Sequence, residues 1–529
     1  MDSKGRVLDK YSARVFKNRK EHVLVKAADN ETQVISANTR VVPGIMTNRG
    51  CCYAGCKGVV LSPLKDVAVI THGPIGCAFY TWGTRRHKGK AGEDGKNFIE
   101  YCLSTDMQEA DIVFGGEKKL RQSIKEVVEI FDPVSVFICS TCPVGLIGDD
   151  IHAIAAEAQE LYGRPVMAFS CEGYKGVSQS GGHHIANNSL MKNVIGTGDA
   201  VKEKFAINVL GEYNIGGDGW EISRILKRCG YHIVSVMTGD GSYKEIQNAH
   251  TADLNIVQCH RSINYIAEML KTKYGTSWIK VNFVGTESTI QALRDMALYF
   301  GDPELIARTE EVIADELSEI TEELEYFRTR LKGKTAALFV GGSRAHHYQF
   351  LLKEMGVETI LAGYEFAHRD DYEGRDIIDS IKEDADSKNI ETITVSADPE
   401  KFNLFLSEEQ YEKLKGKIPL DNYPGMMKDM KEGSIVVDDL NHFETEEFLK
   451  LLKPDIFFSG IKDKYIAQKS GVLSRQLHSY DYRGPYAGFR GAVNFAKDVT
   501  MGIYTPAWGF VTPPWKKSPT LVGTYGGDA

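Results

Sequence analysis

Short apolar segments alternate with amphipathic segments from about residue 60 to about residue 470. Several apolar segments are hydrophobic at nearly every position, which is typical of parallel strands buried on both faces. The pattern predicts strands over Asp66–Ile70, Val134–Cys139, Val166–Cys171, Ala206–Leu210, Ile233–Met237, Leu254–Cys259, Lys280–Val284, Ala336–Val340, Thr359–Ala362, Ser434–Val437 and Asp455–Ser459. Because amphipathic segments separate these strands, we predict an α/β protein of doubly wound, Rossmann-like parallel sheets.

Two amphipathic segments predict long helices. The apolar residues of Glu117–Phe131 fall on one helical face. The apolar residues of Pro303–Leu331 recur at near-helical spacing, and Asp302 and Gly333 are suited to cap its start and its end. Proline is favoured at a first helical position, where its missing N–H costs nothing. We therefore predict helices over both segments.

The length of 529 residues exceeds what one hydrophobic core supports and predicts about three domains. We place an N-terminal extension at 1–36, three α/β domains at 37–205, 206–333 and 334–480, and a C-terminal segment at 481–529. Residues 377–431 are rich in Lys, Asp and Glu and weak in strand pattern, and they predict a surface insertion in the third domain. The C-terminal segment is rich in Gly and aromatic residues, so we expect it to pack on the body or on a partner subunit.

Composition and charge narrow the class of protein. Hydrophobic residues make up 42% and charged residues 26%, as in folded soluble proteins, and the net charge of −9 predicts no nucleic-acid partner and no anionic membrane. No apolar stretch reaches the ~20 residues that cross a bilayer. The basic N-terminus lacks the apolar core of a secretory signal, so we predict a cytoplasmic protein.

The ten cysteines all lie at or before Cys259. In a reducing cytoplasm they are thiols and not a disulfide framework. The ends of six predicted strands carry a cysteine, a glycine pair with arginine, an aromatic residue or a lysine; they are Cys77, Cys142, Cys259, the Gly341–Arg344 turn, Phe366 and Lys462. Because ligand sites of open α/β sheets lie beyond the carboxyl ends of the strands, these residues predict one or more large sites between the domains.

Each cysteine alone also has an ordinary structural explanation. A cysteine beside a buried strand is usually a small core residue. Zinc is an alternative for Cys51, Cys52 and Cys56, but the two-residue spacing of structural zinc pairs is absent. The clustering of thiols thus indicates metal ligation without proving it.

The candidate histidines and arginines have alternatives of the same kind. His183 and His478 each fit a core position, and Arg85 fits a solvated or salt-bridged position. Arg344 after two glycines also fits a phosphate site, since glycines expose backbone amides. The segment Gly211–Glu221 lacks the glycine spacing of a dinucleotide loop, and no G-x-x-x-x-G-K-[ST] loop for ATP occurs. Composition and spacing therefore predict a cytoplasmic multidomain α/β protein with candidate metal ligands, and no more specific function.

Nine segments, taken in order, carry a resemblance to a known family. They are RGCCYAGCKGVV (Arg49–Val60), THGPIGC (Thr71–Cys77), TCPVGLIGDD (Thr141–Asp150), CEGYKGVSQSGGHHIAN (Cys171–Asn187), EYNIGGD (Glu212–Asp218), CHRSINYI (Cys259–Ile266), GYEFAHRDDY (Gly363–Tyr372), SGIKDK (Ser459–Lys464) and QLHSYDYRGPYAGF (Gln476–Phe489). From about residue 37 to about residue 515 the chain resembles the α-subunit family of nitrogenase molybdenum–iron proteins. The resemblance implies three α/β domains that enclose a metal-cluster site, in an α2β2 assembly with a β subunit.

The resemblance also implies the metal ligands. Cys51, Cys77 and Cys142 match the α-side ligands of the P-cluster, an eight-iron, seven-sulfur cluster shared with the β subunit. Cys259 and His478 match the ligands of the iron–molybdenum cofactor, which contains Mo, Fe, S and a central carbon, with Cys259 on a terminal iron and His478 on molybdenum. Thiolates suit iron because they are soft and electron-donating.

Further residues match the wall of the cofactor pocket. Seven residues of this chain match family residues that contact the cofactor; they are Arg85, Gln179, Ser262, Gly341, Gly342, Arg344 and Lys462. Of these, Gln179 and Lys462 match the residues that hold homocitrate. Those that surround the substrate or act in catalysis match Val59, Arg85, Gln179, His183, Arg344 and Phe366. An imidazole such as that of His183 titrates near neutral pH and suits proton relay.

The implied reaction is the reduction of N2 to NH3 with H2 evolution. The electrons come from a separate iron protein that binds transiently and hydrolyses MgATP, and they pass through the P-cluster to the cofactor. The chain itself then uses no ATP. The metal cluster carries the hard chemistry, and the protein contributes positioning, electrostatics and protons.

Several positions depart from the common family pattern. The 377–431 segment and the pair Ala345-His346 resemble the clostridial-type branch, His260 replaces a common Tyr, and Asp463 replaces a common Glu. Cys52 and Cys56 are additional thiols, which we interpret as packing residues. A cofactor-assembly scaffold and a protochlorophyllide-reductase-type subunit are alternatives that have no reason to keep the full set of anchors. Vanadium and iron-only nitrogenases use the same anchors, although the loop from Gly341 to His347 resembles the molybdenum type.

Overall fold

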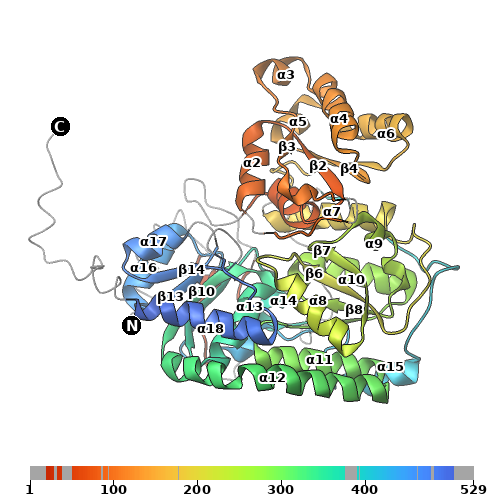
Figure 1. Cartoon of the computed structure of the whole chain (residues 1–529). Helices are drawn as coiled ribbons and strands as arrows, with labels where there is room; N and C mark the ends of the chain where they lie inside the picture. Colours follow the sequence, from red (N-terminus) through yellow and green to blue (C-terminus); the bar gives the residue numbers. More distant parts are fainter. Residues whose placement is uncertain are drawn as a thin grey trace, which may run out of the picture.

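The computed structural model describes residues 19–28, 33–37, 50–84, 87–92, 95–176, 178–375, 390–391, 393–460, 463–477 and 482–505. These residues form three lobes, each built on its own sheet with helices packed against it (Figure 1). All strand neighbours are parallel except at one outer edge, so the predicted α/β class with several parallel sheets is confirmed. No described helix combines the length and the apolar character needed to cross a bilayer.

The first sheet has the strand order β3-β2-β4-β5. Its strands are β2 (Val67–His72), β3 (Leu103–Ser104), β4 (Ser135–Ser140) and β5 (Val166–Phe169). The helices of this part are η2 (Ala54–Leu61), α2 (Ile75–Thr84), η3 (Phe98–Glu100), α3 (Glu109–Phe114), α4 (Glu117–Phe131), α5 (Cys142–Ile147), α6 (Ile151–Tyr162) and α7 (Gln179–Asn193). Every residue of β2 and β4 is buried, which explains why both strands are mostly apolar.

The second sheet has the order β7-β6-β8-β9. Its strands are β6 (Ala206–Glu212), β7 (His232–Thr238), β8 (Leu254–Val257) and β9 (Trp278–Lys280). Its helices are α8 (Asp218–Cys229), α9 (Tyr243–Gln247), η4 (Ala249–Thr251), α10 (His260–Tyr274) and α11 (Thr286–Phe300). A strand was predicted over residues 280–284, but the observed strand β9 ends at Lys280. Val281, Phe283 and Val284 are buried, but they pack in the core after the chain has left the sheet.

The third sheet has the order β1-β12-β11-β10-β13-β14. Its strands are β1 (Val23–Val25), β10 (Thr335–Gly341), β11 (Glu358–Glu365), β12 (Ile435–Asp438), β13 (Ile456–Ser459) and β14 (Leu473–Gln476). Its helices are α13 (Gly342–Glu354), α14 (Arg369–Glu373), α15 (Glu408–Leu414), η6 (Met426–Asp429), α16 (His442–Leu452) and α17 (Asp463–Lys469). The two outer strands, β1 and β14, were not predicted, because a short edge strand carries too few residues for a periodic pattern.

The N-terminal extension is joined to the third lobe. η1 (Arg19–His22) leads into β1, which pairs antiparallel with β12. Arg19 donates from Nε and Nη2 to the two carboxylate oxygens of Glu444, at 2.5 and 2.7 Å, and both side chains are buried. A two-point bond of this kind fixes orientation as well as distance. The domain limits 1–36, 37–205, 206–333, 334–480 and 481–529 stay predictions.

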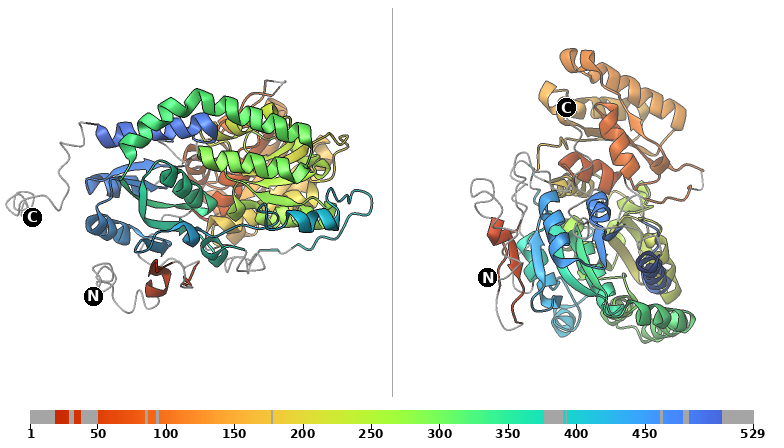
Figure 2. Two further views of the ribbon diagram at one scale, coloured as in Figure 1. Left: turned by 90° about the horizontal axis from the view of Figure 1, so that it is seen from below. Right: turned by 90° about the vertical axis from the view of Figure 1, so that its left-hand side faces the viewer.

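A long helix connects the second and third lobes. α12 (Pro303–Leu331) has the predicted limits, and the Asp302 carboxylate accepts the amides of Glu304 and Leu305 at 3.0 Å each. α12 packs on α8, α11 and the C-terminal helix α18 (Gly488–Tyr504), as Figure 2 shows. The described part of the C-terminal segment thus packs on the body of the chain. Residues 506–529 lie outside the described residues.

The prediction of a surface insertion is wrong for parts of the second half of residues 377–431, although α15 has no buried residue. Leu406 and seven further residues of that half are at most 8% exposed; the seven are Ile418, Leu420, Asp421, Tyr423, Met426, Met427 and Met430. The high content of charged residues conceals this apolar face, because the charges and the buried residues occupy different parts of the segment. Residues 376–389 lie outside the described residues.

We expect removal of one helix cap to loosen α16 locally. The Asn441 side chain accepts the Glu444 amide at 3.0 Å, and Glu444 Oε2 accepts the Asn441 amide at 3.2 Å, which is a capping box. Loss of such a cap costs about 1 kcal/mol. The Asn441→Ala variant should therefore exchange its α16 amide hydrogens about fivefold faster, as measured by native-state hydrogen exchange. Unchanged exchange in α16 would contradict this assignment, and the amides of α4 serve as the internal control.

Candidate metal-cluster sites

Three candidate thiols lie in the first lobe, and two of them face one point on the backbone. Cys77 lies in the first turn of α2, after β2, and Cys142 begins α5, directly after the neighbouring strand β4. Cys51 lies before η2. A Cβ placed on Gly173 would lie 3.0 Å from Cys142 Sγ and 3.3 Å from Cys51 Sγ. The carboxyl ends of adjacent parallel strands therefore bring together residues that are far apart in the sequence.

The other two thiols act electrostatically on Cys77. Burial raises the pKa of the Cys77 thiol, and the nearby Cys51 and Cys142 raise it further. Cys51 is exposed, and the other two thiols are half-buried. A thiol that is costly to ionise alone becomes a thiolate when it binds a metal. Three converging thiols at the surface thus fit a sulfur-rich metal cluster that extends beyond this chain.

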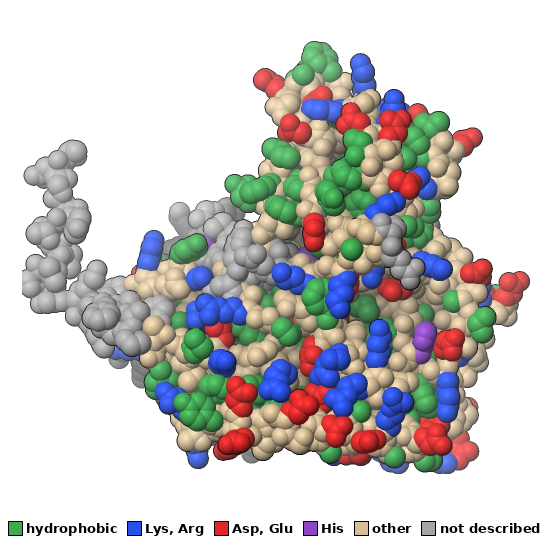
Figure 3. All heavy atoms as spheres, viewed as in Figure 1, with side chains coloured by type: hydrophobic (Ala, Val, Ile, Leu, Met, Phe, Trp, Pro, Cys, Tyr) green, Lys and Arg blue, Asp and Glu red, His purple; other side chains and the backbone are tan. Residues whose placement is uncertain are grey.

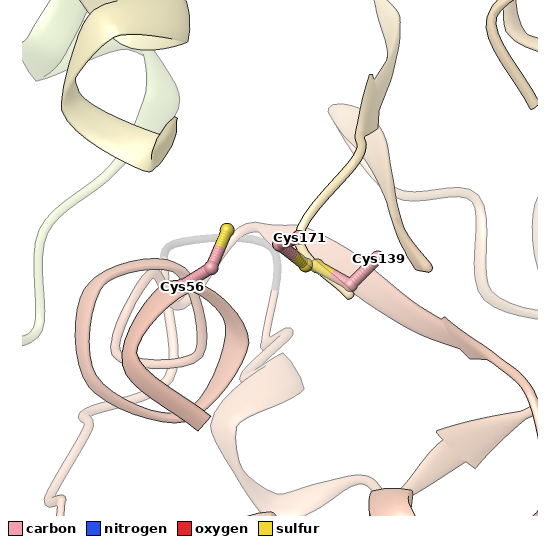
Figure 4. A group of neighbouring side chains, drawn as sticks. All are labelled: Cys56, Cys139 and Cys171. Carbon is pink, nitrogen blue, oxygen red and sulfur yellow. The ribbon is translucent and has the colours of Figure 1, made fainter. Parts of the chain in front are cut away.

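A second group of thiols lies deeper in the same lobe. Cys56 from η2, Cys139 from β4 and Cys171 after β5 are 0% exposed, and their sulfur atoms lie within 4.8 Å of one another (Figure 4). Burial opposes ionisation of Cys139, but hydrogen bonds from the other two thiols and the charge of Lys57 lower its pKa. These residues belong to the main hydrophobic core, which agrees with the interpretation of Cys56 as a packing residue.

The second candidate site is a pocket between the three lobes. Seven of the residues selected from the sequence line it together: Val59, Gln179, His183, Cys259, Gly341, Arg344 and Phe366. They come from η2, α7, the start of α10, the start of α13 and the end of β11. Sequence reasoning missed seven further lining residues: Gly211, Glu212, Tyr213, Ile215, Gln258, Val284 and His347. The position of Gly211 and Glu212 at the carboxyl end of β6 was the available signal for these two residues.

Other predicted residues are not placed in this pocket by the structure. Arg85, Lys462 and His478 lie outside the described residues, as does the side chain of Ser262 on α10. Gly342 begins α13, next to Gly341. The roles of these residues stay predictions.

Two glycines allow the pocket wall to close around Cys259 and Phe366. Gly211 has a φ of 77°, and a Cβ there would lie 2.8 Å from Cys259 N. A Cβ on Gly341 would lie 2.6 Å from Phe366 Cζ. Glycine is required at Gly211, where φ is positive and the close atoms are backbone, whereas at Gly341 an added side chain would displace the Phe366 ring. Phe366 itself has a φ of 52°, and its amide is held by Asp439 Oδ1 at 3.1 Å.

Charged groups are paired around the pocket. Arg344 donates to Leu477 O at 2.6 Å and to Asp218 Oδ2 at 3.1 Å, and its guanidinium lies over the Tyr482 ring. Burial and the nearby Asp218 raise the pKa of Glu212 to about 7, although Arg344 opposes the shift. Positive charge at Arg344 and a carboxyl that can hold a proton at neutral pH thus lie on one wall.

Lys280 and His347 form a pair at the same pocket, with His347 in the lining and Lys280 half-buried. Lys280 Nζ donates to Gln258 O at 2.8 Å and contacts His347 Nε2 at 2.7 Å. Burial lowers the pKa of Lys280 to about 7, and burial together with nearby cations lowers the pKa of His347 well below its usual value. A soft thiol, a guanidinium and an imidazole in one enclosed pocket fit an anionic metal–sulfur cluster, with the thiol on iron and the cation near sulfide.

We expect Glu212→Gln to remove a pH dependence of stability. At acid pH the Glu212 carboxyl is protonated in the folded and the unfolded state, so the variant and the wild type should have the same pH dependence of the free energy of unfolding. As the pH rises from the ordinary value of 4.5 toward about 7, the unfolded carboxyl ionises and the buried one does not. Over this range the free energy of unfolding of the wild type should fall by up to about 1.4 kcal/mol per pH unit relative to that of the variant. Chemical denaturation of the cofactor-free assembly between about pH 5 and about pH 8 measures the difference. Glu203→Gln, at an exposed position, is the control, and parallel pH profiles would contradict the expectation.

The comparisons with known proteins agree with this geometry. The family described as Nitrogenase component 1 type Oxidoreductase matches residues 51–504, and the chain belongs to this family of oxidoreductases. Among particular members, it is 59% identical to the nitrogenase molybdenum-iron protein alpha chain of Clostridium pasteurianum, with 97% of each chain covered. It is 55% identical to the alpha chain of Methanosarcina barkeri, over 98% of this chain and 96% of that one. The resemblance seen in nine sequence segments is confirmed.

A solved structure shows the same fold. The structure described as nitrogenase Cp1 at pH 6.5 matches with a TM-score of 0.93 and 58% sequence identity, and the match covers 97% of this chain and 100% of that chain. The three-lobed arrangement is therefore that of a known nitrogenase chain.

Proposed function

We propose that this chain is the α subunit of the catalytic component of a molybdenum nitrogenase, which reduces N2 to NH3 with H2 evolution. The observation that carries the proposal is the convergence of Cys259, Arg344, Gln179 and His183 on one pocket between three lobes. The similarity to molybdenum-iron alpha chains over nearly the whole chain supports it. When bound, an iron–molybdenum cofactor with homocitrate supplies the electron storage and the chemistry of N2 reduction.

The residues of this chain would bind the cofactor, orient it and restrict the space around it. Cys259 supplies a thiolate to iron, and Arg344 with the amides at Gly341 and Gly342 donates hydrogen bonds to sulfide. Gln179 is placed to orient homocitrate, and Val59 and Phe366 restrict the space beside the cluster. His183, which is 1% exposed, is placed to hold a proton or donate a hydrogen bond next to substrate. His478 on molybdenum, Lys462 on homocitrate, Arg85 on sulfide and Ser262 beside the cofactor complete the proposed set.

We propose that Cys51, Cys77 and Cys142 hold one side of a P-cluster shared with a β subunit in an α2β2 assembly. Figure 3 shows hydrophobic side chains exposed on the upper lobe, among charges of both signs. Large apolar residues of α2 and α5 are strongly exposed, with Phe79 at 52%, Tyr80 at 67% and Leu146 at 78%. Exposed apolar surface next to an open thiol site supports a partner that covers both.

We further propose that electrons reach this assembly from a transiently bound iron protein that hydrolyses MgATP. The assembly is cytoplasmic and has no nucleic-acid or membrane partner, in agreement with a net charge of −9.

Metal analysis of the anaerobically purified assembly tests the proposal. The chain is co-expressed with its β subunit, and molybdenum, vanadium and iron are measured per α subunit. We expect about one molybdenum with many irons, followed by acetylene and N2 reduction when the iron protein and MgATP are added. Vanadium, or iron without a heterometal, would assign the chain to an alternative nitrogenase. Iron equivalent to a single small cluster would favour the assembly scaffold.

A further inference from the structure

The end of the 377–431 segment runs along the edge of the second sheet. Leu420 forms an antiparallel bridge with Ile279 of β9. Asp421 donates its amide to Trp278 O at 2.8 Å, and its carboxylate accepts the Trp278 amide at 3.0 Å. The same carboxylate pairs with Lys271 of α10 at 2.7 Å. Residues 418–424, which we call the strap, therefore connect β9 and α10 as an extra edge segment.

The strap ends in an aromatic contact at the first residue of α10. The Tyr423 ring stacks on the His260 ring, with centroids 4.1 Å apart and an interplanar angle of 17°. The Tyr423 hydroxyl donates to Asp370 Oδ2 at 2.5 Å. On the edge of the imidazole, His260 Nε2 lies 2.6 Å from Asp371 Oδ1, and Asp371 Oδ2 accepts from Arg261 at 3.2 Å. All five side chains are at most 1% exposed.

The opposite edge of His260 meets the first turn of α13. Ser343 Oγ accepts the backbone N–H of His260 at 2.9 Å and lies 2.6 Å from His260 Nδ1. A serine hydroxyl has one proton, which it donates to Nδ1, so Nε2 carries the imidazole proton and donates to Asp371. This neutral tautomer satisfies the hydroxyl, both ring nitrogens and the carboxylate oxygen at once.

These contacts tie together two helix starts that line the pocket. Cys259 directly precedes His260, and Gly341 and Arg344 lie on either side of Ser343. The described lining of the pocket includes Cys259, Gly341 and Arg344 but not Ser343. Any change in the separation of the two helix starts would move the thiol relative to the guanidinium.

We propose that Tyr423 of the strap and Asp371 are positioning residues that hold His260 against Ser343 and so set the separation between Cys259 and the turn from Gly341 to Arg344. This inference rests on the proposed function, because the cluster is what spans that separation. It assigns a role to a segment that the sequence alone left without one. Residues that contact a metal ligand, but not the metal itself, tune the affinity for the metal because they fix the geometry of the ligand.

The first test compares two buried serines in the complete α2β2 assembly. Ser343→Ala removes both bonds between α10 and α13. Ser474→Ala is the matched control, because Ser474 is equally buried and its hydroxyl contacts no hydrogen-bond partner among the described residues. We expect Ser343→Ala to lose molybdenum about tenfold faster on dilution and to change the line shape of the cofactor electron paramagnetic resonance signal. Because Ser343→Ala also leaves the His260 amide and Nδ1 without a partner, its cofactor-free thermal midpoint should lie below that of Ser474→Ala, and the spectral change separates a positioning role from a loss of stability alone.

The second test changes the strap itself. Tyr423→Phe keeps the ring on His260, and Tyr423→Leu removes it. We expect the leucine variant to reproduce the spectral change and molybdenum loss of Ser343→Ala, with the phenylalanine variant near wild type. Wild-type spectra and molybdenum retention in both Ser343→Ala and Tyr423→Leu would overturn the positioning role, as would a loss of stability without a spectral change. Wild-type assembly without molybdenum would instead overturn the proposed function, and the positioning role with it.

Discussion

Replacing Cys259 by alanine is expected to remove the cofactor from an assembly that still folds. Cys259 supplies the only thiol among the described residues that line the pocket. Loss of a supporting partner of a metal ligand already costs about 10–100-fold in metal affinity or activity, so loss of the ligand itself should lower bound molybdenum by about 100-fold or more. Molybdenum analysis and the cofactor electron paramagnetic resonance signal measure this loss, and N2 reduction should fall below detection.

A matched cysteine separates this effect from the removal of a buried thiol. Cys229 on α8 is 0% exposed and lies outside the described lining of the pocket. Cys229→Ala should keep molybdenum at the wild-type level. Iron bound at Cys51, Cys77 and Cys142 should survive in both variants, because that site lies in the first lobe. Normal molybdenum in Cys259→Ala would show that this residue is not an anchor.

Gly182→Ala is expected to disrupt both cluster sites through one contact. Gly182 lies where α7 crosses η2, and a Cβ there would lie 1.9 Å from Cys52 O and 2.4 Å from Cys56 N. Backbone atoms cannot yield as a flexible side chain does, so η2 must move away from α7. We expect the free energy of unfolding to fall by about 3 kcal/mol or more.

The displacement of η2 should also be visible in metal content. η2 carries Val59 of the pocket and follows Cys51, so its movement changes both sites. Chemical denaturation and iron analysis of the purified assembly measure the two effects. Gly83→Ala on α2 is the control, since no described atom lies within 4 Å of its added Cβ and alanine favours a helix. Wild-type stability in Gly182→Ala would contradict the close contact between α7 and η2.

The sequence by itself determined the elements that depend on local pattern. α4 and α12 have the predicted limits, because the amphipathic face of each helix is contained within one continuous stretch, and in α12 a capping residue adds to this signal. The central strands were predicted because burial on both faces leaves an unbroken apolar pattern. The outer strands β1, β3 and β14 were missed because their pairing depends on distant residues, such as Val437 opposite Val23.

The sequence also determined half of the described pocket residues, but only through resemblance to a family. Spacing alone could not join Val59, Gln179, Cys259 and Arg344, because they come from four elements that meet only when three sheets pack together. Glu212 and His347 were missed for the same reason.

Only the tertiary structure decided what the strap does. The many charges of residues 377–431, which contain the strap, predicted an insertion on the surface, since mean composition does not show which side chains point inward. Pairing with β9 and stacking on His260 bury Tyr423, although nothing near Tyr423 in the sequence specifies either partner. Local periodicity specifies helices and strands, whereas a contact between residues far apart in the sequence, such as Tyr423 and His260, depends on the shape of the whole fold.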